Sequence, residues 1–203
     1  IEILTYHVVA DSLLATDVVG TKGIITVNGQ QIDVSVSEAG VFTDRAQVTV
    51  TDIICSTYDG VIFKPFWGDQ SFFYNPENRL SNGTYFATMK LKDGENDSAS
   101  HINREGVWRL NIGLPVKAFE ARFGKRPTRP AQGQSIEGEW DFTTLNTLTP
   151  HPVYGWMGWA AILSPSRETY DTHLAPILDQ AYHKARQAFD KRMRALERSA
   201  AST

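Results

Sequence analysis

The stretch Thr149–Pro165, TPHPVYGWMGWAAILSP, carries the densest unusual chemistry of the chain, and the rest of the fold can be built outward from it. His151 stands between Pro150 and Pro152, so the backbone is stiff on both sides and a turn sets the direction of the imidazole. The residues that follow are apolar and rich in tryptophan, which is typical of a buried strand. We therefore expect a rigid polar turn that leads directly into the core.

A second strand is predicted at Val107–Ile112, within the stretch GVWRLNIGLP. Side chains alternate between the two faces of a strand, so Arg109 and Asn111 share one face. The other face, toward the core, then carries the apolar residues Trp108, Leu110 and Ile112. A guanidinium fork beside an amide can bind a carboxylate or a phosphate. The alternatives are a solvated sheet face, or an ion pair of Arg109 with Asp69 or Glu105.

The turn and the second strand together define a candidate ligand-binding site. Its members are the polar and aromatic side chains of the two stretches: His151, Tyr154, Arg109, Asn111 and Trp159. Rigid placement suits groups that contact a ligand, and ligand pockets are largely apolar with a few polar groups. In the structural interpretation, His151 instead bonds a carbonyl and closes its loop, and the ring of Tyr154 packs. We predict no catalytic residue, metal ligand or cofactor.

Two further groups of residues bear on the site. Aromatic side chains are frequent, and we expect most in the core and a few along a pocket: Trp67, Phe72, Phe73, Tyr74, Trp156 and Trp159. The acidic loop Lys92–Ser100 has carboxylates at alternate positions, as a calcium loop does, but Arg104 stands where the final glutamate of such a loop belongs. The five histidines form no zinc-binding pair, and Cys55 is expected to be a buried small apolar residue.

The first fifty residues predict short strands joined by turns. Ile24–Val27 is a predicted strand, and the Asn28–Gly29 dipeptide after it is a strong hairpin signal. Apolar and polar residues alternate over Ile32–Val36 in the returning strand. Val48 and Val50 alternate into a further strand.

Beyond Val50 the pattern predicts strands with interspersed helices. The expected helices are Asp52–Tyr58, Val116–Phe123, a turn from Asp141 through Leu148, and a long closing helix after the N-cap Ser166. The expected strands besides those above are Ser71–Tyr74 and Tyr85–Leu91. The closing helix has apolar residues at three- and four-residue steps. The predicted class is α+β: a mostly antiparallel sheet with helices on one face and a long C-terminal helix, preceded by a small β-rich segment.

The N-terminal residues resemble the second half of a fasciclin-like domain. The matching pieces are LTYHVV, DSLLATDVVGT, ITVNGQQIDVSVS and VTVTDI, within about residues 1–63. The first half of such a domain is not part of this sequence, and Tyr58–Lys64 departs from the family's closing segment. The resemblance implies an extracellular location, and without it a cytoplasmic one is expected.

About residues 50–194 resemble an uncharacterised bacterial domain-of-unknown-function family, number 6194, which is similar to small YjbR/MmcQ-type proteins. The matching pieces include SFFYNP, YFATMKLKDGENDSAS, NREGVWRLNIGLP, DFTTLNTLTPHPVYGWMGW and ILSPSRETY. The resemblance implies a fold and no activity. Together the two resemblances predict three parts of the chain: a fasciclin-like segment at 1–50, an α+β domain at 51–198 and a flexible tail at 199–203.

The charge of the chain limits the classes of partner. The 203 residues carry a formal net charge of −3, which gives no general attraction to nucleic acid or to an anionic membrane. Residues 1–50 hold six acidic and two basic residues, a net −4, so the remainder stands at +1. No apolar run approaches the roughly 18 residues that span a bilayer, and we predict no membrane span.

These observations favour a non-enzymatic binding or interaction module, with a pocket for a small anionic ligand or a protein partner. The alternative from another class is a small hydrolase or transferase, with His151 as general base and Arg109 as anion clamp. A third alternative is nucleic-acid binding through the basic segment Lys117–Arg129 and the final helix. The sequence specifies neither the ligand nor the oligomeric state.

Overall fold

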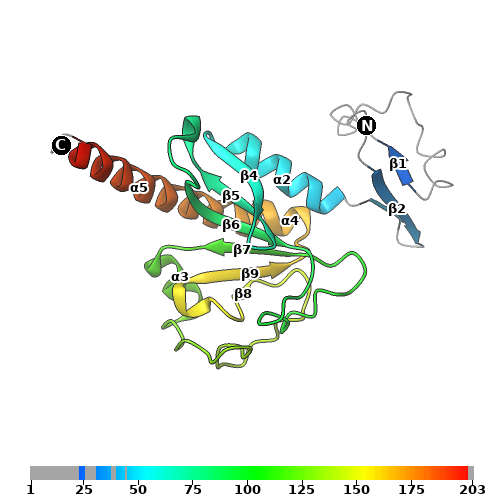
Figure 1. Ribbon diagram of the computed structural model, residues 1–203. Coiled ribbons are helices and arrows are strands. Elements are labelled where there is room, and N and C mark those ends of the chain that lie inside the picture. Colours follow the sequence, from blue (N-terminus) through cyan, green and yellow to red (C-terminus); the bar gives the residue numbers. More distant parts are fainter. Residues whose placement is uncertain (1–22, 26–30, 38–39, 44, 201–203) are drawn as a thin grey trace. The chain divides into compact units, whose positions relative to one another are not determined.

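The computed structural model of the protein describes residues 23–25, 31–37, 40–43 and 45–200 (Figure 1). The contacts of its backbone divide the chain into two units, Ile1–Thr51 and Asp52–Thr203. Each unit is described by itself below, and side chains are described from Val50 onward.

The N-terminal unit contains a small antiparallel sheet. Its strands are β1 (Gly23–Ile25), β2 (Gln31–Ser37) and β3 (Gly40–Thr43), in the order β1-β2-β3. Ile24 lies opposite Ile32, as the predicted hairpin requires. The Asn28–Gly29 turn itself lies outside the described residues.

Helix α2 (Arg45–Thr57) replaces the strand that was predicted at Val48 and Val50, and that prediction is wrong. Val50 and Ile54 lie four residues apart and are both buried, so the helical period, and not the local alternation, describes the burial. The expectation for Cys55 is also wrong, since this residue is exposed. It follows Ile54 directly, and neighbouring positions on a helix point about 100° apart.

The larger unit is built on a six-stranded antiparallel sheet in the order β4-β5-β6-β7-β9-β8 (Figure 1). The strands are β4 (Val61–Phe66), β5 (Asp69–Tyr74), β6 (Thr84–Lys90), β7 (Arg109–Gly113), β8 (Thr149–Pro150) and β9 (Trp159–Leu163). Arg109 lies opposite Leu163, and Asn111 lies opposite Ala161. The predicted α+β class is confirmed, and the two stretches that were singled out in the sequence form the neighbouring strands β7, β9 and β8 of this sheet.

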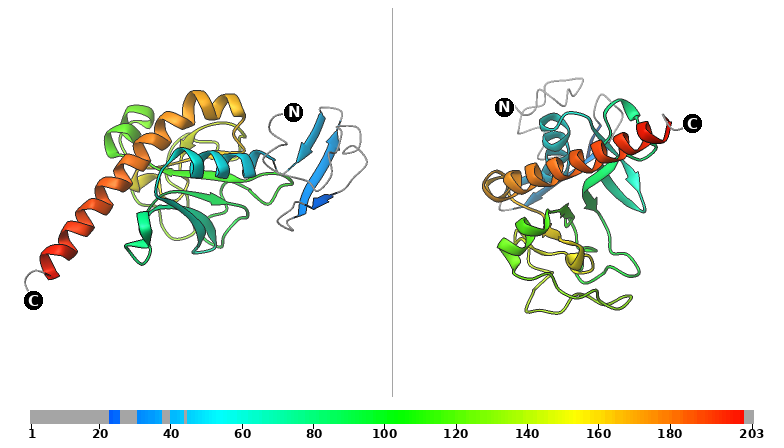
Figure 2. Two further views of the ribbon diagram at one scale, coloured as in Figure 1. Left: turned by 90° about the horizontal axis from the view of Figure 1, so that it is seen from above. Right: turned by 90° about the vertical axis from the view of Figure 1, so that its left-hand side faces the viewer.

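One face of the sheet packs against the C-terminal helix. The helical segment runs through α4 (Arg167–Thr169), the π-turn η4 (Tyr170–Leu174) and α5 (Ala175–Ala200), and α5 contacts β5, β6 and β7 (Figure 2). The Oγ of Ser166 accepts the backbone N–H of Thr169 at 3.1 Å, which confirms the predicted N-cap. The predicted apolar stripe is buried along α5: Ile177, Leu178, Ala181, Tyr182, Ala185 and Phe189.

Loops cover β7 on its other side. All five residues of β7 are buried, so the solvated sheet face that was one interpretation of Arg109 is excluded. Helix α3 (Val116–Phe123) forms as predicted. The expected helical turn after Asp141 does not form, because its carboxylate accepts the N–H and the hydroxyl of Thr143 in a non-helical turn.

Candidate functional site

Arg109 is the centre of a buried polar cluster on the loop-covered side of β7. Its Nε donates to Oδ1 of Asn111 at 2.8 Å, and its Nη1 donates to Oγ of Ser100 at 2.8 Å. Nη1 and Nη2 also form a two-pronged ion pair with the carboxylate of Asp97. Nη2 lies 3.2 Å from Nε2 of His151. Four of the five N–H groups of the guanidinium thus face acceptors, and the fifth, on Nη2, faces Nε2 of His151, whose role depends on the tautomer of the ring.

The ion-pair partner of Arg109 is Asp97, and not Asp69 or Glu105 as expected from the sequence. The loop between β6 and β7 folds back over the sheet and brings Asp97 to the strand that follows it, while Asp69 pairs with Lys90 at 3.1 Å. Asp97 was visible in the sequence as part of the acidic loop, but its spacing there indicated calcium. In the part of the chain that the structure describes, no group of His, Cys, Asp and Glu side chains is placed to hold a metal ion.

The cluster is electrostatically balanced. Burial raises the pKa of the Asp97 carboxyl, but the hydrogen bond and charge of Arg109, with help from Lys90 at 3.8 Å, lower it more, so that the net pKa lies below the usual value. Lys90 and Asp69 add a second pair of opposite charges at the edge of the cluster. Asn111 extends the network by donating to Oγ1 of Thr88 at 2.9 Å. A paired and hydrogen-bonded group of this kind can stay ionised inside a protein.

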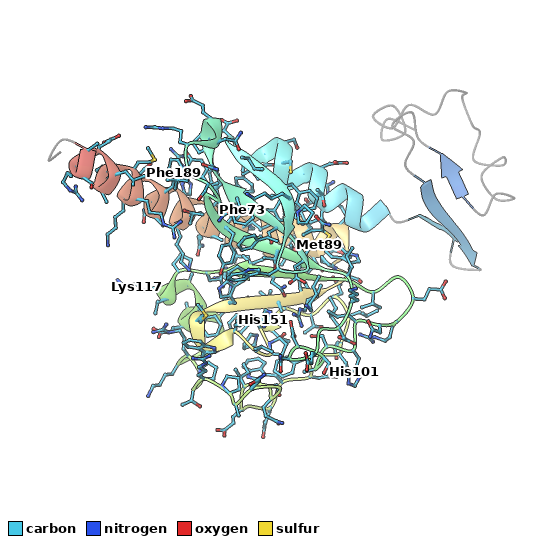
Figure 3. The ribbon with its side chains drawn as sticks, viewed as in Figure 1. Phe73, Met89, His101, Lys117, His151 and Phe189 are labelled. Carbon is cyan, nitrogen blue, oxygen red and sulfur yellow. The ribbon has the colours of Figure 1, made fainter. Side chains whose placement is uncertain are left out.

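His151 holds the turn that the two prolines define. Its Nδ1 accepts the backbone N–H groups of Val153 and Tyr154 at 3.0 and 3.1 Å, so it bonds to donors and not to a carbonyl as the structural interpretation proposed. The side chain is buried beside β9 (Figure 3). Burial, and then the charge of Arg109, hold its pKa well below the usual value, so His151 is neutral at pH 7. The centre of its ring lies 5.0 Å from the centre of the ring of Tyr154.

Tyr154 and Trp159, the other two candidate residues, lie at the surface end of the same turn. Tyr154 is 47% exposed, and Trp159 is partly buried with its ring stacked on that of Tyr85 at a centroid distance of 5.4 Å. The structure therefore brings Arg109, Asn111 and His151 together as a buried cluster and places the two aromatic residues outside it. The binding role of all five residues stays a prediction.

An exposed aromatic surface adjoins this turn, and we define it by Phe66, Trp67, Tyr85, Tyr154 and Trp159. Trp67 is 88% exposed and stacks on Phe66 at 4.7 Å, and Phe66 lies 6.4 Å from Tyr85. Burial, and then the neighbouring Tyr154, raise the pKa of Tyr85. Most aromatic residues were expected in the core, with a few along a pocket. Phe72 and Phe73 are indeed buried, but Trp67 sits at the tip of the β4–β5 hairpin, beside Gly68, and faces solvent.

A surface groove of about 630 Å³ continues from this aromatic surface. It is lined by Phe66, Trp67 and Tyr85, by the segment 80–84, and by Arg192, Ala195 and Leu196 of α5. A second pocket of about 470 Å³ lies between α3 and the π-turn and includes Arg122 and His173. None of the five candidate residues lines either of these two hollows.

The geometry gives less support to the two other predicted functions, a hydrolase or transferase and nucleic-acid binding. His151 has Nδ1 engaged by two backbone donors and Nε2 facing a guanidinium, so neither nitrogen is placed to activate a nucleophile. In the basic segment, Arg126 pairs with Glu120 at 3.7 Å and Arg129 lies over the ring of Trp156. Across residues 45–200, no helix combines the length and the apolar character of a membrane span.

Fold and site together define an α+β domain with a buried, charge-balanced polar cluster and an exposed aromatic surface. The chain belongs to the DUF6194 family, a family of unknown function, whose model matches residues 46–194. Residues 1–64 match a fasciclin domain. Both resemblances that the sequence suggested are confirmed.

Curated relatives of the chain are large proteins of Staphylococcus aureus. The extracellular matrix-binding protein ebh of strain MW2 is 26% identical over 167 residues, which is 72% of this chain. The extracellular matrix-binding protein EbhB of strain Newman is 26% identical over 134 residues, or 61% of this chain. The chain spans about 2% of the length of each of these relatives. No solved structure matches the chain.

Proposed function

We propose that this chain is a non-catalytic binding module that attaches to extracellular-matrix material through its aromatic surface. The observation that carries the proposal is the exposure of Trp67, at 88%, within a set of neighbouring aromatic rings. Exposed aromatic groups on a rigid sheet are the side chains that most often dominate binding energy at protein interfaces. Burial of such a ring by a partner removes a large apolar area from water.

The buried cluster around Arg109 and His151 holds the turn that carries Tyr154, one member of the aromatic surface. His151 accepts the N–H groups that define the turn, and the backbone N–H of Tyr154 is one of them. Arg109 joins that histidine to Asp97 and to Asn111 of the same strand. The predicted ligand residues then divide into a supporting group, in which Arg109, Asn111 and His151 position the turn, and a contacting group of Tyr154 and Trp159.

The class of partner is inferred from the relatives. The S. aureus proteins are named as extracellular matrix-binding proteins, and the N-terminal residues match a fasciclin domain. Matrix material therefore is the partner that these similarities favour. The proposal assigns no catalytic step to the module, because His151 is neutral, buried and already hydrogen-bonded.

Retention of the full chain on a sensor coated with reconstituted basement-membrane matrix tests the proposal. We expect wild-type protein to bind and the double variant W67A/Y85A to bind at least tenfold more weakly, since about 1.4 kcal/mol or more of ring contact is lost. The matched control is Leu91→Ala, which removes an exposed apolar side chain outside the aromatic surface. Equal retention of wild type and W67A/Y85A would contradict the proposal.

A further inference from the structure

The groove beside Trp67 contains the one buried side-chain oxygen without a hydrogen-bond partner that the described residues include. This atom is Oγ1 of Thr84, at the start of β6. Thr84 lines the groove, and its backbone is held by pairing with Tyr74. A buried hydroxyl without a partner is unfavourable by about 1–3 kcal/mol, so such atoms are rare and often mark a ligand or functional position.

The same groove has a fixed cation and lacks a lining carboxylate. Nη1 of Arg192 donates to the backbone carbonyl of Gly83 at 3.0 Å, which holds the guanidinium against the groove wall. No aspartate or glutamate is among the residues that line the groove. Three of the five guanidinium N–H groups lie on Nη2 and Nε, and the structure gives them no acidic partner among the described residues. The groove therefore favours an acidic ligand.

The other side chains that line the groove are of the kinds that bind sugars. The faces of Trp67 and Tyr85 carry the negative quadrupole of aromatic rings, which attracts the partly positive C–H groups on the flat side of a pyranose. Ser81 and Asn82 present a hydroxyl and an amide that can exchange hydrogen bonds with sugar hydroxyls. A proline-rich peptide would use the rings but would leave Arg192 without an acidic partner.

We infer that this groove binds an acidic glycan, a sugar chain that carries carboxylate or sulfate groups. Rings of the chain stack on Trp67 and Tyr85, and an acidic group pairs with Arg192. Rotation of the Thr84 side chain about χ1 brings its Oγ1 out of the buried position to a sugar hydroxyl, which supplies the missing hydrogen bond. This inference rests on the proposed function because it uses part of the same aromatic surface, and it adds the chemical class of the ligand.

Calorimetric titration of the full chain with four probes tests the inference. The probes are a hyaluronan hexasaccharide, a heparin hexasaccharide, neutral chitohexaose and decaproline. We expect at least one acidic hexasaccharide to bind at least tenfold more tightly than chitohexaose and decaproline, and comparison of the two acidic probes separates carboxylate from sulfate. Equal or tighter binding of chitohexaose or decaproline would overturn the inference.

Three variants separate the contacts. Arg192→Gln is expected to lower the affinity for the acidic probe about tenfold, because one charge-assisted contact is lost. The matched control, Arg194→Gln on the same helix, should leave the affinity unchanged. Thr84→Val is expected to weaken binding severalfold and to raise the Tm of the free chain by about 2–4 °C, because it removes a buried unpaired hydroxyl. The rise in Tm also shows that the variant folds. Unchanged affinity in both Arg192→Gln and Thr84→Val would overturn the inference.

The two proposals fail in different ways. If the chain binds matrix and W67A/Y85A does not, but no acidic hexasaccharide binds, the glycan inference is wrong and the proposed function stands. If neither matrix nor hexasaccharide binds, both are wrong.

Discussion

Nη2 of Arg109 lies 3.2 Å from Nε2 of His151, while Nδ1 of the same imidazole accepts two backbone N–H groups. Both ring nitrogens therefore face donors, although a neutral imidazole has only one acceptor nitrogen. A second proton on the ring would place an N–H against a donor on each side. This arrangement adds to burial, the largest cause, and to the charge of Arg109 in disfavouring the charged form of His151.

The first prediction concerns the pH dependence of stability. The pKa of His151 in the folded chain lies well below its ordinary 6.5, so the unfolded chain takes up a proton near pH 6.5 and the folded chain does not. The free energy of unfolding is therefore not reduced by His151 above about pH 6.5. Below this pH it decreases by up to about 1.4 kcal/mol per pH unit. Urea unfolding between pH 7 and pH 4.5 measures this slope.

His151→Asn is the matched variant for that experiment. An asparagine oxygen at this position can still accept backbone N–H groups of the turn, but it does not titrate. We expect a flatter profile between pH 6.5 and pH 4.5, a range above the ordinary pKa of Asp97. A wild-type slope in the variant would show that other groups cause the pH dependence.

The second prediction concerns the pair of Arg109 and Asp97. Arg109→Met leaves the carboxylate of Asp97 largely buried without its main partner, and we expect a loss of about 3–5 kcal/mol in the free energy of unfolding. Adding Asp97→Asn to this variant removes the uncompensated charge and should recover part of the loss. A double-mutant cycle in urea measures the coupling, and additive effects of the two substitutions would argue against a direct ion pair.

The third prediction compares two glycines with left-handed backbone. Gly83 has φ of +71°, and a Cβ there would lie 2.6 Å from Cβ of Asn75 and 2.7 Å from the carbonyl oxygen of Tyr74. Gly68 has φ of +85° with nothing within 4 Å. We expect Gly68→Ala to lower stability by about 1–2 kcal/mol through backbone strain alone, and Gly83→Ala by about 1–3 kcal/mol more. Chemical denaturation measures both, and equal losses would contradict the steric argument.

The fourth prediction concerns the support of the aromatic surface. A Cβ on Gly113 would lie 3.0–3.3 Å from the ring of Trp159, so Gly113→Ala should push this ring off Tyr85. We expect a changed near-ultraviolet circular dichroism spectrum and a loss of about 1–3 kcal/mol. Gly94→Ala is the control, since its Cβ would meet only the flexible end of Lys90. An unchanged aromatic spectrum in Gly113→Ala would show that the stack tolerates the added methyl group.

Much of the fold could be predicted because its elements have strong local patterns. The apolar stripe of α5, the cap at Ser166 and helix α3 were all evident from spacing alone. The helix at Val48 and Val50 was not, because two alternating valines are a strand pattern, and only the four-residue spacing of Val50 and Ile54 fits a helix. Burial of Val50 with Ile54 decides for the helix, and burial depends on the rest of the domain.

The residues of the candidate site could be predicted from the sequence, but their arrangement in space could not. Arg109 and Asn111 share a strand face by periodicity, and the prolines make the turn at His151 rigid. That the three lie together follows from the pairing of β7 with β9, which brings the two stretches side by side. Trp67 was grouped with the expected core aromatic residues because of its apolar ring, although Gly68 directly after it is a turn residue.

The sequence by itself determined the strongest periods, and with them strands β5, β6, β7 and β9, helices α3 and α5, and the face that each of their side chains occupies. It did so because backbone geometry repeats every two or 3.6 residues, independently of distant contacts. Only the tertiary structure decided that Asp97 is the partner of Arg109, that His151 accepts hydrogen bonds from its own turn, and that Trp67 faces solvent. Those outcomes depend on which loops cover which face of the sheet, and contacts between residues distant in sequence determine that covering.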